Sequence, residues 1–264
     1  MKIADSISAC FFRRQWRGAS RLHRVLLGGR RIEAASRHGI VWQLDPYEYV
    51  DGFVLRYGFY EEEVLEAELA RLAPGEVFWD VGANIGIHAL TVRRLRPDVR
   101  VHAFEPNPAM AALITAASAR NALDLTLHSL ALDADAGRAK FFVHEGNAGR
   151  SGLHNWDADP QLKSIEVATQ RGDTAIAAGL APAPHVLKID VEGNEARTLQ
   201  GMHTLLHTGP LHTVIFEDVI QDDSQVKTLL RDAGFTIAQL TRKEPTHHNL
   251  ENYVAKKDRP RGSA

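Results

Sequence analysis

Short apolar runs alternate with segments whose apolar residues recur at helical spacing, and this alternation begins at Val77. The run from Val77 to Val81 is apolar apart from Asp80, which is typical of a strand buried on both faces of a parallel sheet. Alternation of strands and helices along the chain predicts a mostly parallel sheet whose strands are joined by right-handed crossover helices. The predicted strands are 77–81, 100–104, 124–130, 186–190 and 212–216, and the predicted helices are 86–96, 108–120, 195–207 and 223–233.

Segments that interrupt the alternation predict additions to this sheet. The polar turn before the last strand favours an antiparallel hairpin over another crossover. The fold class is therefore α/β and Rossmann-like, with a seven-stranded, mostly parallel sheet and a C-terminal antiparallel hairpin. The additions are strands at 139–144 and 164–169 around a loop at 146–155, expected to lie over the functional site, and final strands at 235–240 and 250–255.

The residues before Val77 predict a cap on this sheet. Gly39 to Leu44 and Val50 to Leu55 are predicted to form a hairpin, because Asp45-Pro46 between them is typical of a turn. The acids from Glu61 to Glu63 suit the first turn of a helix. The predicted parts are a basic N-terminal extension and hairpin cap at 1–60, a main domain at 61–255 and a flexible tail at 256–264.

Charge is unevenly distributed over the 264 residues. The formal net charge is -2, yet residues 1 to 38 carry nine Lys and Arg against Asp5 and Glu33. A solvated basic helix is the common explanation of such a segment, and peripheral contact with an anionic membrane or a glycolipid is the alternative. We expect no nucleic-acid partner.

Cysteine content and hydropathy point to a cytoplasmic protein. Cys10 is the single cysteine, which excludes an internal disulfide and a cysteine-based zinc site. No run of 18 apolar residues exists, and the arginine-interrupted start lacks the apolar core of a secretory signal. An organellar transit peptide is a minor alternative for the arginine-rich start.

The turn after the first buried strand predicts a cofactor site. Asp80 stands ahead of Gly82 and Gly86, at a strand-to-helix turn where backbone N–H groups meet ligands. A dinucleotide fingerprint would have a third glycine, and the charge of Asp80 would repel a pyrophosphate. The same charge attracts an ammonium group, which S-adenosylmethionine carries. Glu105, at the end of the next strand, suits hydrogen bonds to ribose hydroxyls. The two carboxylates therefore favour S-adenosylmethionine.

The chain resembles the FkbM-type S-adenosylmethionine-dependent methyltransferases, a class I methyltransferase family, from about Gly39 to Ala255. The resemblance implies the class I fold and usually a hydroxyl acceptor. Its most specific block is the strand end Leu187 to Glu195. The other blocks are Asp80 to Gly86, Phe104 to Asn107, and Gly146-Asn147 with Ser151 to Leu153.

The resemblance also implies the cofactor contacts. The residues that would surround the methionine moiety are Asp80, Gly82, Asn84 and Gly86. Glu105 would bind the ribose, with Asn107 beside it. The residues from Ser129 to Ala131 would flank the adenine. Two departures from the family pattern concern acceptor recognition: the middle loop has fewer serines, and Arg171 to Thr174 replaces a Leu-Asp-x-Leu start.

Candidate catalytic groups are the strand-end carboxylates Asp190, Glu192 and Glu217, because ligands of open α/β sheets bind at this edge. One of them would take the proton of the acceptor hydroxyl, with Asp190 preferred, or two would hold a divalent cation. Capping the following helix is the alternative role of Glu192. The alternative bases are His88, His144 and His154.

Two other functions are compatible with parts of the pattern. An NAD(P)-dependent reductase would use Gly82, Gly86 and Glu105, but Asp80 and the missing glycine oppose it. A non-catalytic S-adenosylmethionine-binding or scaffold protein would leave the carboxylates without chemistry. The acceptor itself stays open among glycans, lipid-linked sugars, polyketide alcohols and small metabolites.

Overall fold

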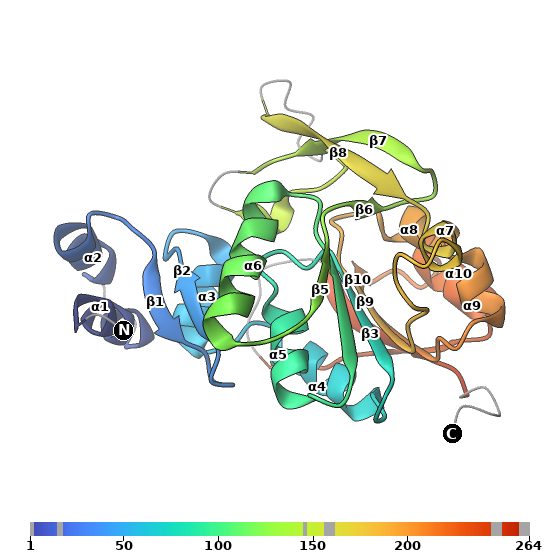
Figure 1. The fold of residues 1–264 in the computed structure, drawn as a ribbon, viewed down its shortest axis with the longest axis horizontal. Coiled ribbons are helices and arrows are strands. Elements are labelled where there is room, and N and C mark those ends of the chain that lie inside the picture. Colours follow the sequence, from blue (N-terminus) through green and yellow to red (C-terminus); the bar gives the residue numbers. More distant parts are fainter. Residues whose placement is uncertain (1–2, 15–17, 145–146, 156–161, 244–249, 259–264) are drawn as a thin grey trace.

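A central seven-stranded sheet organises the protein (Figure 1). The computed structural model describes residues 3–14, 18–144, 147–155, 162–243 and 250–258. All neighbouring strands run parallel except β12, which is antiparallel to both of its neighbours. The predicted mostly parallel sheet with a C-terminal antiparallel hairpin is thereby confirmed. The strand order is β11 (Thr236–Gln239), β12 (Leu250–Lys256), β10 (Thr213–Val219), β9 (Val186–Ile189), β3 (Val77–Val81), β4 (Arg100–Phe104) and β5 (Thr126–His128).

Helices cover both faces of this sheet, so the side chains of a strand enter two cores in alternation. In β3, Phe78 joins the core under one helix layer, and Trp79 joins the core under the other. One layer holds α4 (Glu62–Arg71), α5 (Ile87–Leu95) and α6 (Pro108–Asn121); the other holds α8 (Glu195–Gln200), α9 (His203–Thr208) and α10 (Gln225–Asp232), with α7 (Gly172–Ala177) beside α9.

The predicted hairpin of residues 39–44 and 50–55 is wrong in its second strand. The partner of β2 (Val41–Leu44) is β1 (Ile32–Ala35), which precedes it, and residues 50–55 belong to helix α3 (Tyr49–Tyr57). In that helix Val50 and Val54 are four residues apart on one buried face. Asp45 still makes a turn, because its Oδ1 accepts a hydrogen bond from Tyr47 N at 3.0 Å.

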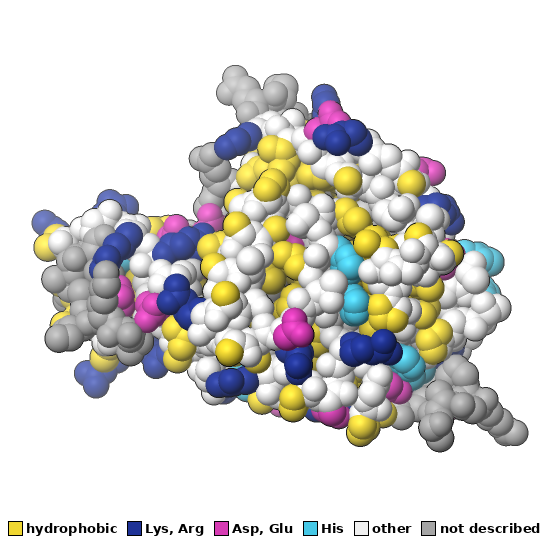
Figure 2. Space-filling view, viewed as in Figure 1, with side chains coloured by type: hydrophobic (Ala, Val, Ile, Leu, Met, Phe, Trp, Pro, Cys, Tyr) yellow, Lys and Arg dark blue, Asp and Glu magenta, His cyan; other side chains and the backbone are white. Residues whose placement is uncertain are grey.

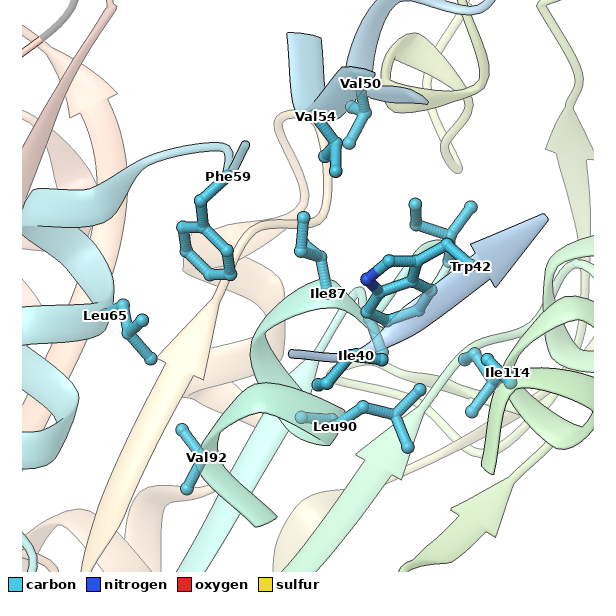
Figure 3. Packing of buried hydrophobic residues seen from close by; sticks show 14 of the residues in the cluster. Ile40, Trp42, Val50, Val54, Phe59, Leu65, Ile87, Leu90, Val92 and Ile114 are labelled. Carbon is cyan, nitrogen blue, oxygen red and sulfur yellow. The ribbon is translucent and has the colours of Figure 1, made fainter. Parts of the chain in front are cut away.

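The N-terminal hairpin packs into the same core as helices α5 and α6. Figure 3 shows Ile40 and Trp42 of the hairpin segment facing Leu90 and Ile114. Helices α1 (Ile3–Arg13) and α2 (Ala19–Leu27) lie outside them at the end of the molecule (Figure 1).

Two arginines of the basic segment form ion pairs with carboxylates of the α3 and α4 helices. Arg31 Nη1 lies 2.9 Å from Asp51 Oδ2, and Arg37 Nη1 lies 3.2 Å from Glu62 Oε2. In Figure 2, Lys and Arg side chains are distributed over the N-terminal part and the rest of this face, and do not gather in a single patch. Among the described residues, no helix combines the length and the apolar character needed to cross a membrane.

A second sheet of three strands lies beside the edge strand β5 (Figure 1). It contains both extra strands predicted from the sequence, with a turn of 3-10 helix, η1 (Ala148–Arg150), in the loop between them. Gly146 lies outside the described residues, as do 259–264 of the predicted tail. The strands are β6 (Ala131–Leu132), β7 (Gly137–Phe142) and β8 (Ser164–Gln170).

One predicted helix is divided in two and one predicted strand is shortened. The helix expected at 195–207 is divided into α8 and α9 at Gly201, whose Cα packs so tightly that a Cβ would lie 2.2 Å from Asp133 O. The strand expected at 124–130 is shorter, because the chain leaves the main sheet after His128 to form β6.

Candidate active site

A cavity of about 810 Å³ opens at the carboxyl ends of β3, β4, β9 and β10. Parallel strands bring the residues that follow them to one edge of the sheet, so segments far apart in sequence meet there. The predicted residues that line this cavity are Gly82, Asn84, Glu105, Asn107, Ala131, Asp190, Glu192 and Glu217.

Gly82 allows the turn after β3 to touch the end of β9. Its φ is 84°, and a Cβ at this position would lie 1.8 Å from the carbonyl oxygen of Asp190. No side chain fits there, so a glycine is required. Gly86 (φ 81°) does not line the cavity, because a Cβ there would point at Ile114 of α6, at 3.0 Å.

Asn84 presents an unpaired acceptor beside the cavity. Its backbone N–H donates to Glu105 Oε2 at 2.8 Å, in a left-handed conformation with φ 53°. Its Oδ1 is buried without a hydrogen-bond partner. A buried carbonyl oxygen without a donor is costly, so the site suits a ligand that donates here, such as an ammonium group.

Glu105 is held by backbone donors on both oxygens. Oε1 accepts from Asn107 N and Oε2 from Asn84 N, each at 2.8 Å, and burial raises the pKa of this carboxyl to about 8. Each oxygen retains a lone pair for a hydroxyl. Asn107 lines the cavity too, but its Oδ1 caps α6 by accepting from Ala109 N at 3.0 Å.

Asp80 lies beneath the cavity, not on its wall. Its side chain is 1% exposed; Oδ2 accepts from Ala89 N at 3.0 Å, and Oδ1 lies 3.7 Å from Lys188 Nζ. These contacts fix the start of α5 and balance a buried lysine. In the structure α5 and β9 enclose the Asp80 carboxylate, and its predicted place facing the ligand ammonium stays a prediction.

Of the two residues predicted to flank the adenine, the structure places one on the cavity wall. Ala131 lines the cavity together with Leu130 and Leu132, whereas the Ser129 side chain is exposed and absent from the wall. An apolar stretch of this kind suits the face of a flat aromatic ring.

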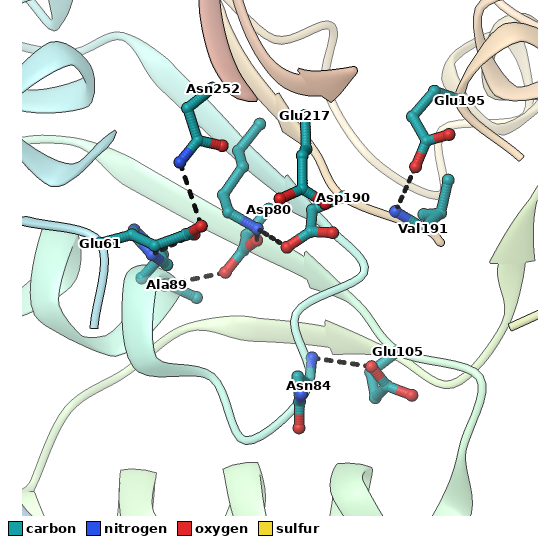
Figure 4. Close-up of polar contacts among 12 residues, drawn as sticks. Glu61, Asp80, Asn84, Ala89, Glu105, Asp190, Val191, Glu195, Glu217 and Asn252 are labelled. Atoms are coloured by element: carbon teal, nitrogen blue, oxygen red, sulfur yellow. Dashed lines mark hydrogen bonds and ion pairs between the residues drawn. The ribbon is translucent and has the colours of Figure 1, made fainter. Parts of the chain in front are cut away.

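Asp190 is the most open of the ion-paired carboxylates at the centre of the site. Its side chain is 30% exposed, against 18% for Glu217 and 1% for Asp80. Lys188 Nζ donates to Asp190 Oδ2 at 3.2 Å (Figure 4). Burial opposes the charge of Lys188, but Asp190 and Asp80 raise its pKa above the ordinary value. The charged lysine therefore fixes the Asp190 carboxylate.

Sequence reasoning missed the role of Lys188. The available signal was a lysine inside an otherwise apolar, fully buried strand, because a buried charge requires a partner. Asp80 and Asp190, the partners of Lys188, were both identified as candidate site residues. Their contacts with Lys188 could not be predicted from the sequence.

Glu192 and Glu217 complete the carboxylate group. Burial, followed by repulsion from Asp190, raises the pKa of Glu192 to about 9 and that of Glu217 to about 8. Glu217 Oε1 is also bound by Arg242 Nη2 at 3.2 Å. The capping role considered for Glu192 is not seen, because α8 begins at Glu195 without a side-chain cap; Glu195 Oε1 instead accepts from Val191 N at 3.0 Å, in the turn before the helix. Within the described residues, no three His, Cys, Asp or Glu side chains converge as a metal site.

A second buried group, also missed, closes the cavity from the N-terminal side. Glu61 lines the cavity, and its Oε1 accepts from Asn252 Nδ2 at 3.0 Å. His88 lines it too, with Nδ1 3.1 Å from Glu68 Oε1 and with Nε2 3.9 Å from Glu61 Oε2. Burial, with the nearby charge of Lys188, lowers the pKa of His88 to about 4. The acids from Glu61 to Glu63 were assigned from the sequence to the first turn of a helix, so Glu61 was not identified as a residue of the cavity wall.

The other two histidines are not placed at the cavity. His144 and His154 are absent from its wall, and His154 is exposed. His88 is therefore the histidine that the structure brings to the site among the three considered.

Comparisons with known proteins place these residues in a family context. A model described as the methyltransferase FkbM domain matches residues 80–237. The hexuronic acid methyltransferase AglP of Haloferax volcanii is 31% identical over 187 residues, which cover 70% of this chain and 74% of the relative. The 31-O-demethyl-FK506 methyltransferase FkbM of Streptomyces tacrolimicus is 31% identical over 195 residues, covering 63% and 75%.

Similar solved structures have lower identity. The precorrin-6y C5,15-methyltransferase of Geobacter metallireducens is 17% identical with a TM-score of 0.46, covering 75% of this chain and 89% of that one. TYW2 of M. jannaschii, solved in complex with AdoMet, is 13% identical with a TM-score of 0.44, covering 85% of each chain.

Proposed function

Because the chain belongs to the methyltransferase FkbM domain family and is an S-adenosylmethionine-dependent methyltransferase, we propose that it methylates a hydroxyl oxygen of a sugar, a glycan or a secondary metabolite. The relatives' names support this proposal in part: one names a sugar acid as the acceptor, as a hexuronic acid methyltransferase, and the other, acting on 31-O-demethyl-FK506, names an oxygen. The NAD(P)-dependent reductase considered above loses its support with this membership.

The residues around the turn after β3 fit the cofactor. Asn84 Oδ1 would accept from the ammonium group, Glu105 would accept from the ribose hydroxyls, and the apolar wall at Ala131 would flank the adenine. When bound, S-adenosylmethionine supplies a methyl group already activated on a sulfonium. The protein then has to orient the acceptor, exclude water and receive a proton.

Asp190 is proposed as the group that receives the proton. Its carboxylate is the observation that carries the proposal, because it lies on the cavity wall at the strand end, 30% exposed and fixed by Lys188 at 3.2 Å. In this role an Asp190 oxygen would accept the proton of the acceptor hydroxyl, so that the hydroxyl oxygen could take the methyl group that bound S-adenosylmethionine supplies, with S-adenosylhomocysteine as the leaving group. Glu192 and Glu217, on the same wall, would orient the acceptor.

The test combines binding with turnover. We expect calorimetry to show S-adenosylhomocysteine binding, and mass spectrometry to show an O-methyl product from a panel of methyl hexosides, a hexuronide and a macrolide alcohol. Asp190→Asn should lower kcat by about 10²–10⁴ and leave S-adenosylhomocysteine affinity nearly unchanged. Asp135→Asn, in a side chain that is 80% exposed, is the matched control and should keep full activity.

Several results would contradict the proposal. Full activity of Asp190→Asn would exclude it as the proton acceptor, and a methyl group on nitrogen or carbon would exclude O-methylation. Cofactor binding without turnover of any panel compound would favour the non-catalytic alternative.

A further inference from the structure

We infer that the end of the cavity formed by Tyr49, Tyr60, Glu61 and Glu217 binds the methyl acceptor, and that it takes an uncharged polyol in preference to a sugar that carries a carboxylate. The inference rests on the proposed function and names the acceptor class for the same site. It concerns residues that precede the family match at 80–237 as well as residues within it.

The strand order separates the two ends of the cavity. Glu105 follows β4, Asp190 follows β9 and Glu217 lies on β10, in the order β4, β3, β9, β10 across the sheet. With neighbouring strands about 4.8 Å apart, Glu217 lies three strand steps from β4. The Asn84 and Glu105 end fits the cofactor, so the wall beyond Asp190 is left for the acceptor.

Glu61 is fixed at that far end by contacts from two directions. It adopts a left-handed conformation with φ 58°, and its carbonyl oxygen accepts from Val64 N at 3.0 Å at the start of α4. Its side chain is held by Asn252 of β12, the residue paired in register with Glu217 (Figure 4). A strained residue held on both sides is typical of functional sites.

Two tyrosine rings form the apolar part of this end. Tyr49 and Tyr60 both line the cavity, with ring centroids 6.1 Å apart at an interplanar angle of 82°. Aromatic rings offer flat apolar surface to the C–H face of a sugar, and carboxylates accept hydrogen bonds from its hydroxyls. The combination of tyrosines with Glu61 and Glu217 therefore suits a polyol.

The charge of the wall disfavours an anionic acceptor. The Lys and Arg side chains on the described part of the cavity wall are Lys188 and Arg150. Lys188 is paired with Asp190 and Asp80, and Arg150 interacts with Glu192. The burial and the Asp190 charge that raise the pKa of Glu61, Glu192 and Glu217 would act on an acceptor carboxylate in the same way. No uncommitted cation on the described part of the wall would offset them, and an unmatched charge at such a site costs several kcal/mol.

Binding of two matched probes tests the acceptor class. Methyl α-D-glucopyranoside and methyl α-D-glucopyranosiduronate, which differ by the carboxylate, are titrated by NMR into protein saturated with S-adenosylhomocysteine. We expect the neutral sugar to bind at least about tenfold more tightly. Equal or tighter binding of the uronate would overturn the inference, as would binding of neither sugar. Failure to bind S-adenosylhomocysteine would instead overturn the proposed function.

A variant pair tests the role of Glu61. Glu61→Gln keeps the side-chain size and removes the charge, so the preference for the neutral sugar should fall severalfold while S-adenosylhomocysteine affinity stays the same. Glu66→Gln, on the exposed side of the same helix, should keep the wild-type preference. An unchanged preference in folded Glu61→Gln would show that Glu61 does not select the acceptor. The wild-type ratio decides the acceptor class even if this variant does not fold.

Discussion

Gly82 is the residue on which the geometry of the site most directly depends. Its lack of a side chain lets the turn after β3 meet the backbone of Asp190, which joins the cofactor end to the proposed proton acceptor. Asn84, two residues later, lines the cavity and has a buried side-chain oxygen without a hydrogen-bond partner. The contact between Gly82 and the backbone of Asp190 therefore sets the distance between the residues proposed for the cofactor and the proposed proton acceptor.

Gly82→Ala should destabilise the protein by more than about 3 kcal/mol, because the new Cβ would collide with a backbone oxygen that cannot rotate away. Gly75→Ala is the matched control: its φ of 79° is equally strained, but nothing lies within 4 Å. It should cost about 1 kcal/mol. Urea unfolding measures both, and equal losses would show that the contact with Asp190 is not what requires glycine.

Among the elements, the N-terminal hairpin and α6 are joined through the side chain of Asn121. Asn121 Oδ1 accepts from Val41 N at 2.8 Å, and its Nδ2 donates to Val41 O at 2.9 Å and to Ala117 O at 2.8 Å. The amide thus satisfies both backbone groups of Val41 as a neighbouring strand would. This contact keeps the segment before α3, and with it Tyr49, next to the main domain.

Asn121→Ala should lower the free energy of unfolding by about 1–3 kcal/mol, because Val41 loses both of its side-chain partners. Arg120→Ala removes the neighbouring surface pair with Glu33 and should cost under about 1 kcal/mol. Denaturant unfolding gives both values, and limited proteolysis reports whether the hairpin loosens first. A smaller loss for Asn121→Ala than for Arg120→Ala would contradict the assigned role.

The elements also show what the sequence can and cannot predict. The strand at 77–81 was predictable because an apolar run followed by glycines has one plausible structure. Residues 50–55 were mistaken for a strand because Val50 and Val54, four apart, share a face in a strand and in a helix alike. The strand-end carboxylates were predictable from topology. Glu61 was not, because its position depends on Asn252, 191 residues away.

For the molecule as a whole, the crowded carboxyls make stability depend on pH. Burial raises the pKa of Glu68 and of Glu105 to about 8, well above the value of 4.5 for an unperturbed glutamate. Such groups contribute stability that is fully present below pH 4.5 and is lost as the pH rises through 8. His88, with its pKa lowered to about 4, acts in the opposite sense, and its contribution is lost as the pH falls from 6.5 towards 4.

The melting temperature should therefore fall as the pH rises from about 6 to 8, by an amount equivalent to a few kcal/mol. Glu68→Gln removes one of the titrating groups and should flatten this fall, whereas Glu66→Gln, which is exposed, should not. Differential scanning calorimetry at several pH values measures the effect. A fall of the same size in Glu68→Gln would show that Glu68 does not ionise in this range.

The position of Tyr49, Tyr60 and Glu61 before residue 80 has a consequence for how such enzymes diversify. Apart from Glu217, the residues assigned to the acceptor end are encoded upstream of the stretch that faces the cofactor, and Asn252 and Asn121 hold the upstream part against the main domain. Mutation or recombination in the upstream stretch can then alter acceptor choice while the donor machinery is inherited intact.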